Sequence, residues 1–138
     1  MTITEENFVE RAEKAIKELI EMKNPKTGHV EPRVTTSQIR NLLAMSADIY
    51  NDVILLREDR LPESICGRIQ YLKVRMIYEA GRTSEVRRLV ENANLLKIVD
   101  EIQGRRKNYL LYSRYMEALV AYHRYYREED WGGQKHVC

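Results

Sequence analysis

One long helix is predicted by Arg68-Ile-Gln-Tyr71-Leu-Lys-Val-Arg75-Met-Ile-Tyr78-Glu-Ala-Gly81-Arg82, where apolar, basic and aromatic residues recur at steps of three and four. This spacing matches the period of an α-helix. One face of the helix carries the apolar side chains that must pack on neighbouring elements, namely Ile65, Ile69, Leu72, Met76 and Ala80. The remaining apolar segments of the chain must therefore supply the partners of this face.

A second face of the same helix alternates cations with aromatic rings, in a set that we call the Arg/Tyr stripe: Arg68, Tyr71, Arg75, Tyr78 and Arg82. At about 100° per residue, these side chains fall within roughly a quarter of the helix circumference. Guanidinium groups bind phosphate oxygens and aromatic rings stack on bases, so the stripe suits a single-stranded or backbone-read nucleic acid. A solvated helix surface explains each residue equally well, and both interpretations stay open.

Helical periodicity continues along the rest of the chain, with Gly and Pro placed between the periodic segments. We expect an all-α, compact single-domain bundle of about five helices. They cover about residues 4–23, 35–57, 62–81, 83–104 and 106–127. Residues 1–127 would form the bundle domain, and residues 128–138 a flexible C-terminal tail. The Tyr-rich last helix is more typical of a core or a subunit interface than of a base-stacking platform.

Several residues mark the ends of these helices. Thr35 and Gln38 have the spacing of a capping box, and Pro62 suits the first turn of the third helix. Gly81 suits a left-handed position at the C-terminus of that helix, after which Thr83 or Ser84 caps the next one.

Composition limits the classes of protein. The 138 residues are 43% hydrophobic and carry a net charge of only +2. No apolar run approaches the roughly 20 residues that span a bilayer, and the N-terminus lacks the pattern of a signal peptide. The two cysteines, Cys66 and Cys138, have no disulfide or metal-ligand spacing. We therefore expect a cytoplasmic protein without a membrane partner, whose basic residues concentrate between positions 60 and 90.

Catalytic motifs are missing from the sequence. The three histidines are His29, His123 and His136. A helical ribonuclease of the HEPN type would need Arg and His four to six residues apart, whereas eight residues separate Arg114 from His123. His136 and Cys138 would make a poor two-ligand metal site at a chain end, and no glycine-rich loop follows a strand. We therefore expect no enzymatic activity, no cofactor and no metal.

Three motifs together resemble the small helical subunit of the type III-A CRISPR (Csm) effector complex. They are Thr35-Thr-Ser-Gln-Ile-Arg40-Asn-Leu-Leu43, the Arg/Tyr stripe with its surrounding residues, and Tyr112-Ser-Arg114-Tyr115-Met-Glu-Ala-Leu-Val-Ala-Tyr122-His123. Their order and spacing cover nearly the whole chain. Lys73 stands where the family often has Arg, which keeps the charge but loses the forked geometry.

The resemblance implies a non-catalytic subunit of an RNA-guided antiviral complex. Copies of the chain would stack as an inner filament beside other subunits, and would contact the backbones of guide RNA and target RNA without sequence preference. The residues expected to contact RNA are Arg40, Arg68, Lys73, Arg75, Arg82 and Arg114. Charge reversal at Arg75 and Arg82 would weaken capture of target RNA by a folded protein.

Two other classes remain open at this stage. A helical transcription regulator would prefer a particular duplex DNA, usually as a dimer. A protein-only scaffold or adaptor would use the Tyr-rich surface and would have no affinity for nucleic acid. Sequence-independent binding of RNA separates the three classes.

Overall fold

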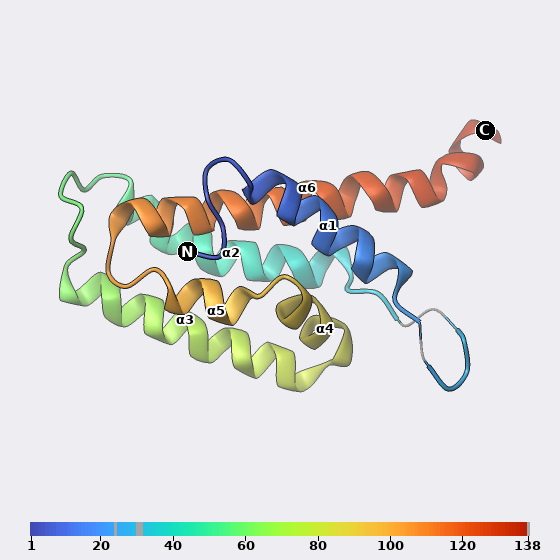
Figure 1. The fold of residues 1–138 in the computed structure, drawn as a ribbon, viewed down its shortest axis with the longest axis horizontal. Coiled ribbons are helices and arrows are strands. Elements are labelled where there is room, and N and C mark those ends of the chain that lie inside the picture. Colours follow the sequence, from blue (N-terminus) through green and yellow to red (C-terminus); the bar gives the residue numbers. More distant parts are fainter. Residues whose placement is uncertain (24, 30–31, 138) are drawn as a thin grey trace.

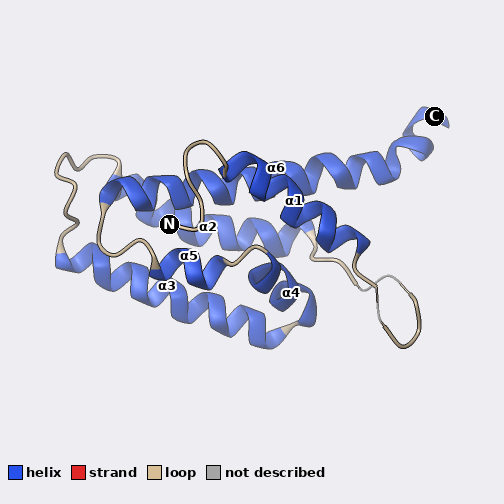
Figure 2. Cartoon of the chain, viewed as in Figure 1, coloured by secondary structure: helices blue, strands red, loops and turns tan. Residues whose placement is uncertain are grey.

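The computed structural model describes the backbone of residues 1–23, 25–29 and 32–137, and the side chains of these residues as far as Arg127. The named elements within this part of the chain are α-helices (Figure 2): α1 (Phe8–Glu21), α2 (Thr36–Val53), α3 (Glu63–Arg82), α4 (Ser84–Asn92), α5 (Leu95–Asp100) and α6 (Arg106–Val137). The predicted all-α class is confirmed. Among the described residues, no helix has the length and apolar character needed to cross a bilayer.

The helices form a bundle in which α6 packs on α1 and α2, while α3 packs on α2, α4 and α5. Figure 1 shows α2 and α3 running in opposite directions, with the loop between them at one end of the molecule and α4 at the other. The C-terminal part of α6 extends past the other helices in this view. Helix α6 continues to Val137, beyond the predicted end at Arg127, and the division into residues 1–127 and 128–138 stays a prediction.

The core contains the apolar faces expected from the sequence. On α3, Ile65, Ile69, Leu72 and Met76 are buried, and Ala80 is half-buried at the edge of the core. On α6, Tyr109, Tyr112 and Tyr115 are buried, so the tyrosines in this part of the helix belong to the core as expected.

Each of these tyrosine hydroxyls has a polar partner on another helix or its cap. Tyr109 donates to the carbonyl of Ser46 at 2.5 Å, and the hydroxyl of Tyr112 lies 2.7 Å from Ser46 Oγ. Tyr115 donates to the carbonyl of Ala93 at 2.9 Å. Burial raises the pKa of all three, that of Tyr115 to about 12. These hydrogen bonds remove the cost of burying a hydroxyl and fix α6 against α2 and the end of α4.

The predicted capping signals are present at the starts of α2 and α4. The backbone N–H of Gln38 donates to Thr35 Oγ1 at 3.1 Å, and the backbone N–H of Thr35 donates to Gln38 Oε1 at 2.8 Å. These two hydrogen bonds complete the capping box. Thr83 accepts a hydrogen bond from the Val86 amide at 3.4 Å and so caps α4.

Two boundary predictions were wrong. Gly81 is not a left-handed cap: it lies within α3, and Thr83 leaves the helix with extended angles (φ −137°, ψ 141°). The reversal therefore needs no glycine, because Thr83 ends one helix and caps the next. The predicted fourth helix is two helices, since Asn94 is left-handed (φ 56°, ψ 36°) and separates α4 from α5.

Candidate nucleic-acid interface

The Arg/Tyr stripe lies along the outer side of α3, beside the buried face and not in it. Tyr71 and Tyr78 are 62% and 60% exposed, and Arg75 and Arg82 are also exposed. The α-helical geometry of α3 produces this arrangement, because steps of three and four place the stripe on one side. The stripe is thus separate from the buried face of α3, with Arg68 half-buried and the other four residues exposed.

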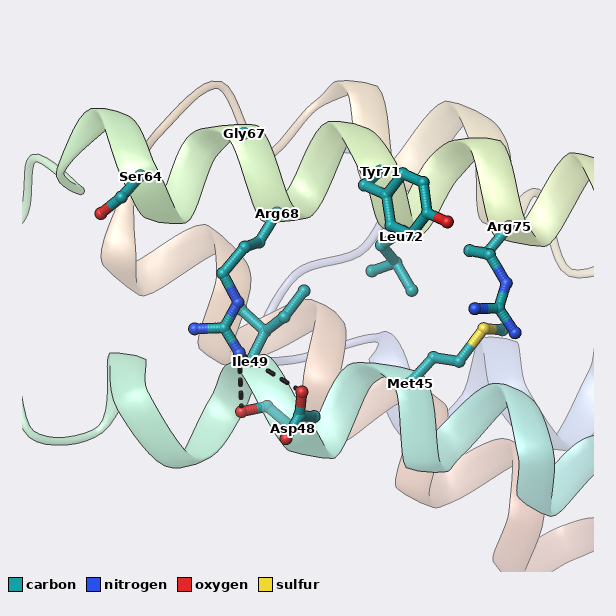
Figure 3. A pocket seen from close by; sticks show the side chains of 9 residues that line it. All are labelled: Met45, Asp48, Ile49, Ser64, Gly67, Arg68, Tyr71, Leu72 and Arg75. Atoms are coloured by element: carbon teal, nitrogen blue, oxygen red, sulfur yellow. Dashed lines mark hydrogen bonds and ion pairs between the residues drawn. The ribbon is translucent and has the colours of Figure 1, made fainter.

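Arg68, at the N-terminal end of the stripe, is held by two carboxylates of α2. Its guanidinium lies 2.5 Å from Asp52 Oδ2 and 3.4 Å from Asp48 Oδ2, and it also donates to the Asp48 carbonyl at 3.3 Å. Figure 3 shows Arg68 reaching from α3 to Asp48. The hydrogen bond with Asp52 and the charges of both carboxylates raise the pKa of Arg68. The guanidinium therefore stays protonated but much of its charge is neutralised locally.

A groove of about 440 Å³ runs between α2 and α3 and is partly lined by the stripe. Its apolar wall comes from Met45, Ile49 and Leu72, and its polar rim includes Arg68 and Arg75. Figure 3 shows Arg75 pointing from α3 toward α2. Arg75 makes no ion pair with any residue that the structure describes. The groove thus has one neutralised and one unneutralised guanidinium, a combination that can attract an anion at the Arg75 end.

The other candidate residues are spread over the molecule. Lys73 lies on the opposite flank of α3 and pairs with Asp100 of α5 at 2.7 Å. Arg82 pairs with Glu79 at 3.4 Å and lies over the Tyr78 ring at 5.9 Å. Arg114 of α6 pairs with Glu5 at 3.5 Å. Arg40 is exposed on α2 outside the groove, and like Arg75 it makes no ion pair among the described residues.

Arg68 and Arg75 therefore line the same groove, whereas the other four candidate cations do not line it. The residues that the sequence reasoning missed are Asp48 and Asp52. Their spacing of four residues places both on one side of α2, which was a usable signal. Which of the helices this side faces could not be inferred before the packing was known.

No cluster of three or more metal-ligating side chains occurs among the described residues. His123 is buried, and its Nε2 lies 2.9 Å from the Val34 carbonyl. The side chain of His136, together with Cys138, lies outside the described residues, as does the side chain of Trp131.

Comparison with known proteins assigns the chain to a family. Residues 5–129 match the family model described as Csm2, type III-A. The chain is 38% identical over 128 residues to the CRISPR system Cms protein Csm2 of Streptococcus thermophilus, covering 93% of this chain and 98% of the relative. It is 35% identical over 130 residues to the protein of the same name from Mycobacterium tuberculosis, covering 94% and 99% of the two chains. The family model and these relatives cover nearly the whole of this helical chain, including the motifs around Thr35, Arg75 and Tyr115. The chain therefore belongs to the Csm2 family of type III-A CRISPR systems.

Proposed function

We propose that the chain is a non-catalytic small subunit of a type III-A CRISPR RNA-guided complex. Several copies stack as an inner filament beside the other subunits and contact the backbones of guide and target RNA without reading sequence. This role places the chain in the cytoplasm, where target transcripts are found. The observation that carries the RNA-contact part is Arg75, an exposed guanidinium on the rim of the α2/α3 groove without an ion pair among the described residues.

The exposed rings beside Arg75 support a backbone-binding surface. Tyr71 lines the same groove, and Tyr78 lies one turn further along α3. Cations grip phosphates while aromatic faces stack on any base, so such a surface tolerates every sequence. A complex whose specificity comes from base pairing with a guide needs this kind of contact.

Ion pairing within the chain supports an order of preference among the six candidate residues. Arg75 and Arg40 lead, because neither makes an ion pair within the described part of the chain. Arg68, Lys73, Arg82 and Arg114 must first exchange a carboxylate for a phosphate. That exchange costs least for Arg114, because its ion pair with Glu5 is exposed on both sides and such pairs contribute only about 0–1 kcal/mol. Arg68 has two carboxylates to lose and ranks last.

The first test is a pull-down of the tagged chain from its native host, with sequencing of the RNA and identification of the proteins recovered with it. Repeat-derived guide RNA together with larger subunits is the expected result. Recovery of one specific DNA locus would indicate a transcription regulator, and recovery of proteins alone would indicate a scaffold.

The second test is charge reversal in the assembled complex. Arg75→Glu, alone and with Arg82→Glu, is expected to weaken capture of target RNA while circular dichroism shows an unchanged helical fold. Lys14→Glu on α1 is the matched control, because Lys14 is exposed, lies away from the stripe and undergoes the same change of charge. Unchanged capture by a well-folded double variant would contradict the proposed contact.

A further inference from the structure

The groove between α2 and α3 has the parts of a second phosphate site at its Arg68 end. Ser64, Gly67 and Arg68 line this end, and all three come from the first two turns of α3 (Figure 3). Ser64 and Gly67 are exposed, and a Cβ added at Gly67 would meet no atom within 4 Å. A hydroxyl, a guanidinium and an open backbone position close to a helix N-terminus are groups that bind phosphate in proteins.

Two carboxylates of α2 take the place of a phosphate at Arg68, and their positions differ. Asp52 makes the close contact, at 2.5 Å from Nη1, and does not line the groove. Asp48 lines the groove and makes longer contacts with Nη2, at 3.4 Å from its carboxylate and 3.3 Å from its carbonyl. Asp52 therefore anchors Arg68, whereas Asp48 lies where a ligand of the groove would enter.

The contact of Asp48 with Arg68 is the weaker of the two. The Asp48 side chain is 84% exposed, and an exposed ion pair with a separation of 3.4 Å contributes little to stability. The hydrogen bonds of Arg68 with both aspartates use only its two terminal nitrogens, which leaves the Nε–H group without a partner in the described part of the chain. A phosphate could displace Asp48 while Asp52 still holds Nη1, but the negative charge of Asp48 repels it.

We propose that the Arg68 end of the groove is a latent phosphate site, which Asp48 keeps closed in the wild-type chain. This inference rests on the proposed function, in which the groove contacts an RNA backbone at Arg75, and it names the residue that limits the contact to that end. Arg68 precedes Arg75 by seven residues of α3, a distance of about 10 Å along the helix at about 1.5 Å per residue. A strand bound at Arg75 and lying along the groove therefore passes Arg68 as well.

A limit on the affinity of each copy has a physical consequence in an assembly. Contacts made by linked copies reinforce one another, so a small gain in each copy becomes a large gain in the complex. Phosphate contacts carry no sequence information, and one more contact in each copy would strengthen binding to every RNA, whether or not it pairs with the guide. By closing the Arg68 end, Asp48 keeps this unselective part of the affinity low.

The test measures the affinity of purified complexes for target RNA at several salt concentrations. Asp48→Asn removes the charge and keeps the shape of the side chain. It is expected to bind RNA more tightly than the wild type and to steepen the slope of log affinity against log salt concentration by about 0.7–0.9 for each copy in contact with the RNA, the value for one added phosphate contact. Arg68→Gln in the same chain is expected to abolish this gain, because the added contact is made by Arg68.

Glu91→Gln on α4 is the matched control. Its carboxylate is 64% exposed and pairs with Arg87 at 3.6 Å, and neither residue lines the groove. E91Q removes the same charge as D48N and is expected to keep the wild-type slope. A wild-type slope with D48N that is folded by circular dichroism would overturn the proposal. A gain that persists in D48N/R68Q would overturn it too, because the gain would then come from the general loss of negative charge.

Failure of the proposed function has a different outcome. If the wild-type chain does not purify with guide RNA and larger subunits, the function is wrong, and the latent site is then tested on isolated chains by calorimetry with tripolyphosphate as the probe. Tighter binding by D48N than by the wild type and by D48N/R68Q would support the site. Equal affinities of the three chains, or no binding by D48N, would overturn it.

Discussion

His123 is buried between α6 and the segment that precedes α2, and it has a single assignable tautomer. Its Nε2 lies 2.9 Å from the Val34 carbonyl. A carbonyl can only accept, so Nε2 carries the hydrogen and the neutral ring has no proton on Nδ1. Burial lowers the pKa of His123, and the charges of Arg127 and Arg33 act in the same direction.

Stability is therefore expected to fall on mild acidification. The folded-state pKa lies below the unfolded value of about 6.5, so the unfolded chain takes up the proton first. The contribution of the neutral ring is complete above about pH 6.5 and is lost as pH falls through the folded-state pKa. Urea unfolding between about pH 7.5 and 5 measures this loss before carboxylates with pKa values near 4 titrate.

His123→Asn is the matched variant, because it keeps an N–H donor but does not titrate. Its unfolding free energy is expected to depend less on pH than that of the wild type in this window. Equal slopes in the two proteins would contradict the assignment of the pH dependence to His123.

Among the elements, α4 and α5 show how one residue divides a helix. The apolar residues of both segments share a helical period, yet Asn94 is left-handed between them. The Asn94 amide donates to the Glu91 carbonyl at 3.1 Å, and the Ile98 amide donates to the Asn94 carbonyl at 3.0 Å. This single position turns the chain so that Val90 of α4 and Leu95 of α5 both reach the core.

Asn94→Ala is expected to lower the free energy of unfolding by about 1–2 kcal/mol, because alanine tolerates a left-handed conformation poorly. Asn94→Gly should change it little, since glycine adopts positive φ readily. Asn51→Ala, at an exposed helical position of α2, controls for the loss of an asparagine and should be neutral or slightly stabilising. Equal effects of N94A and N51A in urea unfolding would contradict this account.

For the whole molecule, the distribution of charge matters more than its sum. A net charge of +2 gives weak general attraction to nucleic acid. Packing then neutralises part of the basic segment, because carboxylates from α2 and α5 pair with Arg68 and Lys73. The remaining attraction is local, at residues such as Arg75.

Salt dependence tests this local view in the assembled complex. Arg75→Gln is expected to make the slope of log affinity for target RNA against log salt concentration shallower by about 0.7–0.9, the value for one lost phosphate contact. Lys14→Gln should leave the slope unchanged. A slope for R75Q equal to that of the wild type would show that Arg75 does not contact a phosphate.

Features within a single helix could be predicted from the sequence, whereas some helix ends could not. Three features were predicted because each depends on spacing within one helix. They are the capping box at Thr35, the position of Tyr71 and Tyr78 on a face separate from the core, and the burial of Ile65, Ile69, Leu72 and Met76. The left-handed cap at Gly81 was wrong, since Thr83 performs the reversal. The division at Asn94 was missed, because a single left-handed residue leaves the apolar period almost unchanged.

The sequence by itself determined the all-α class, the buried faces, the stripe on α3 and the family, since these are encoded in local periodicity and in the order of motifs. Only the tertiary structure decided which cations are neutralised by carboxylates of the same chain and which can attract an external anion. Arg68 and Arg75 are equivalent on one helix, yet Asp48 and Asp52 of α2 neutralise the first and not the second. The physical reason is that an ion pair between helices depends on their packing and register, which position two distant segments to within a few ångströms of each other.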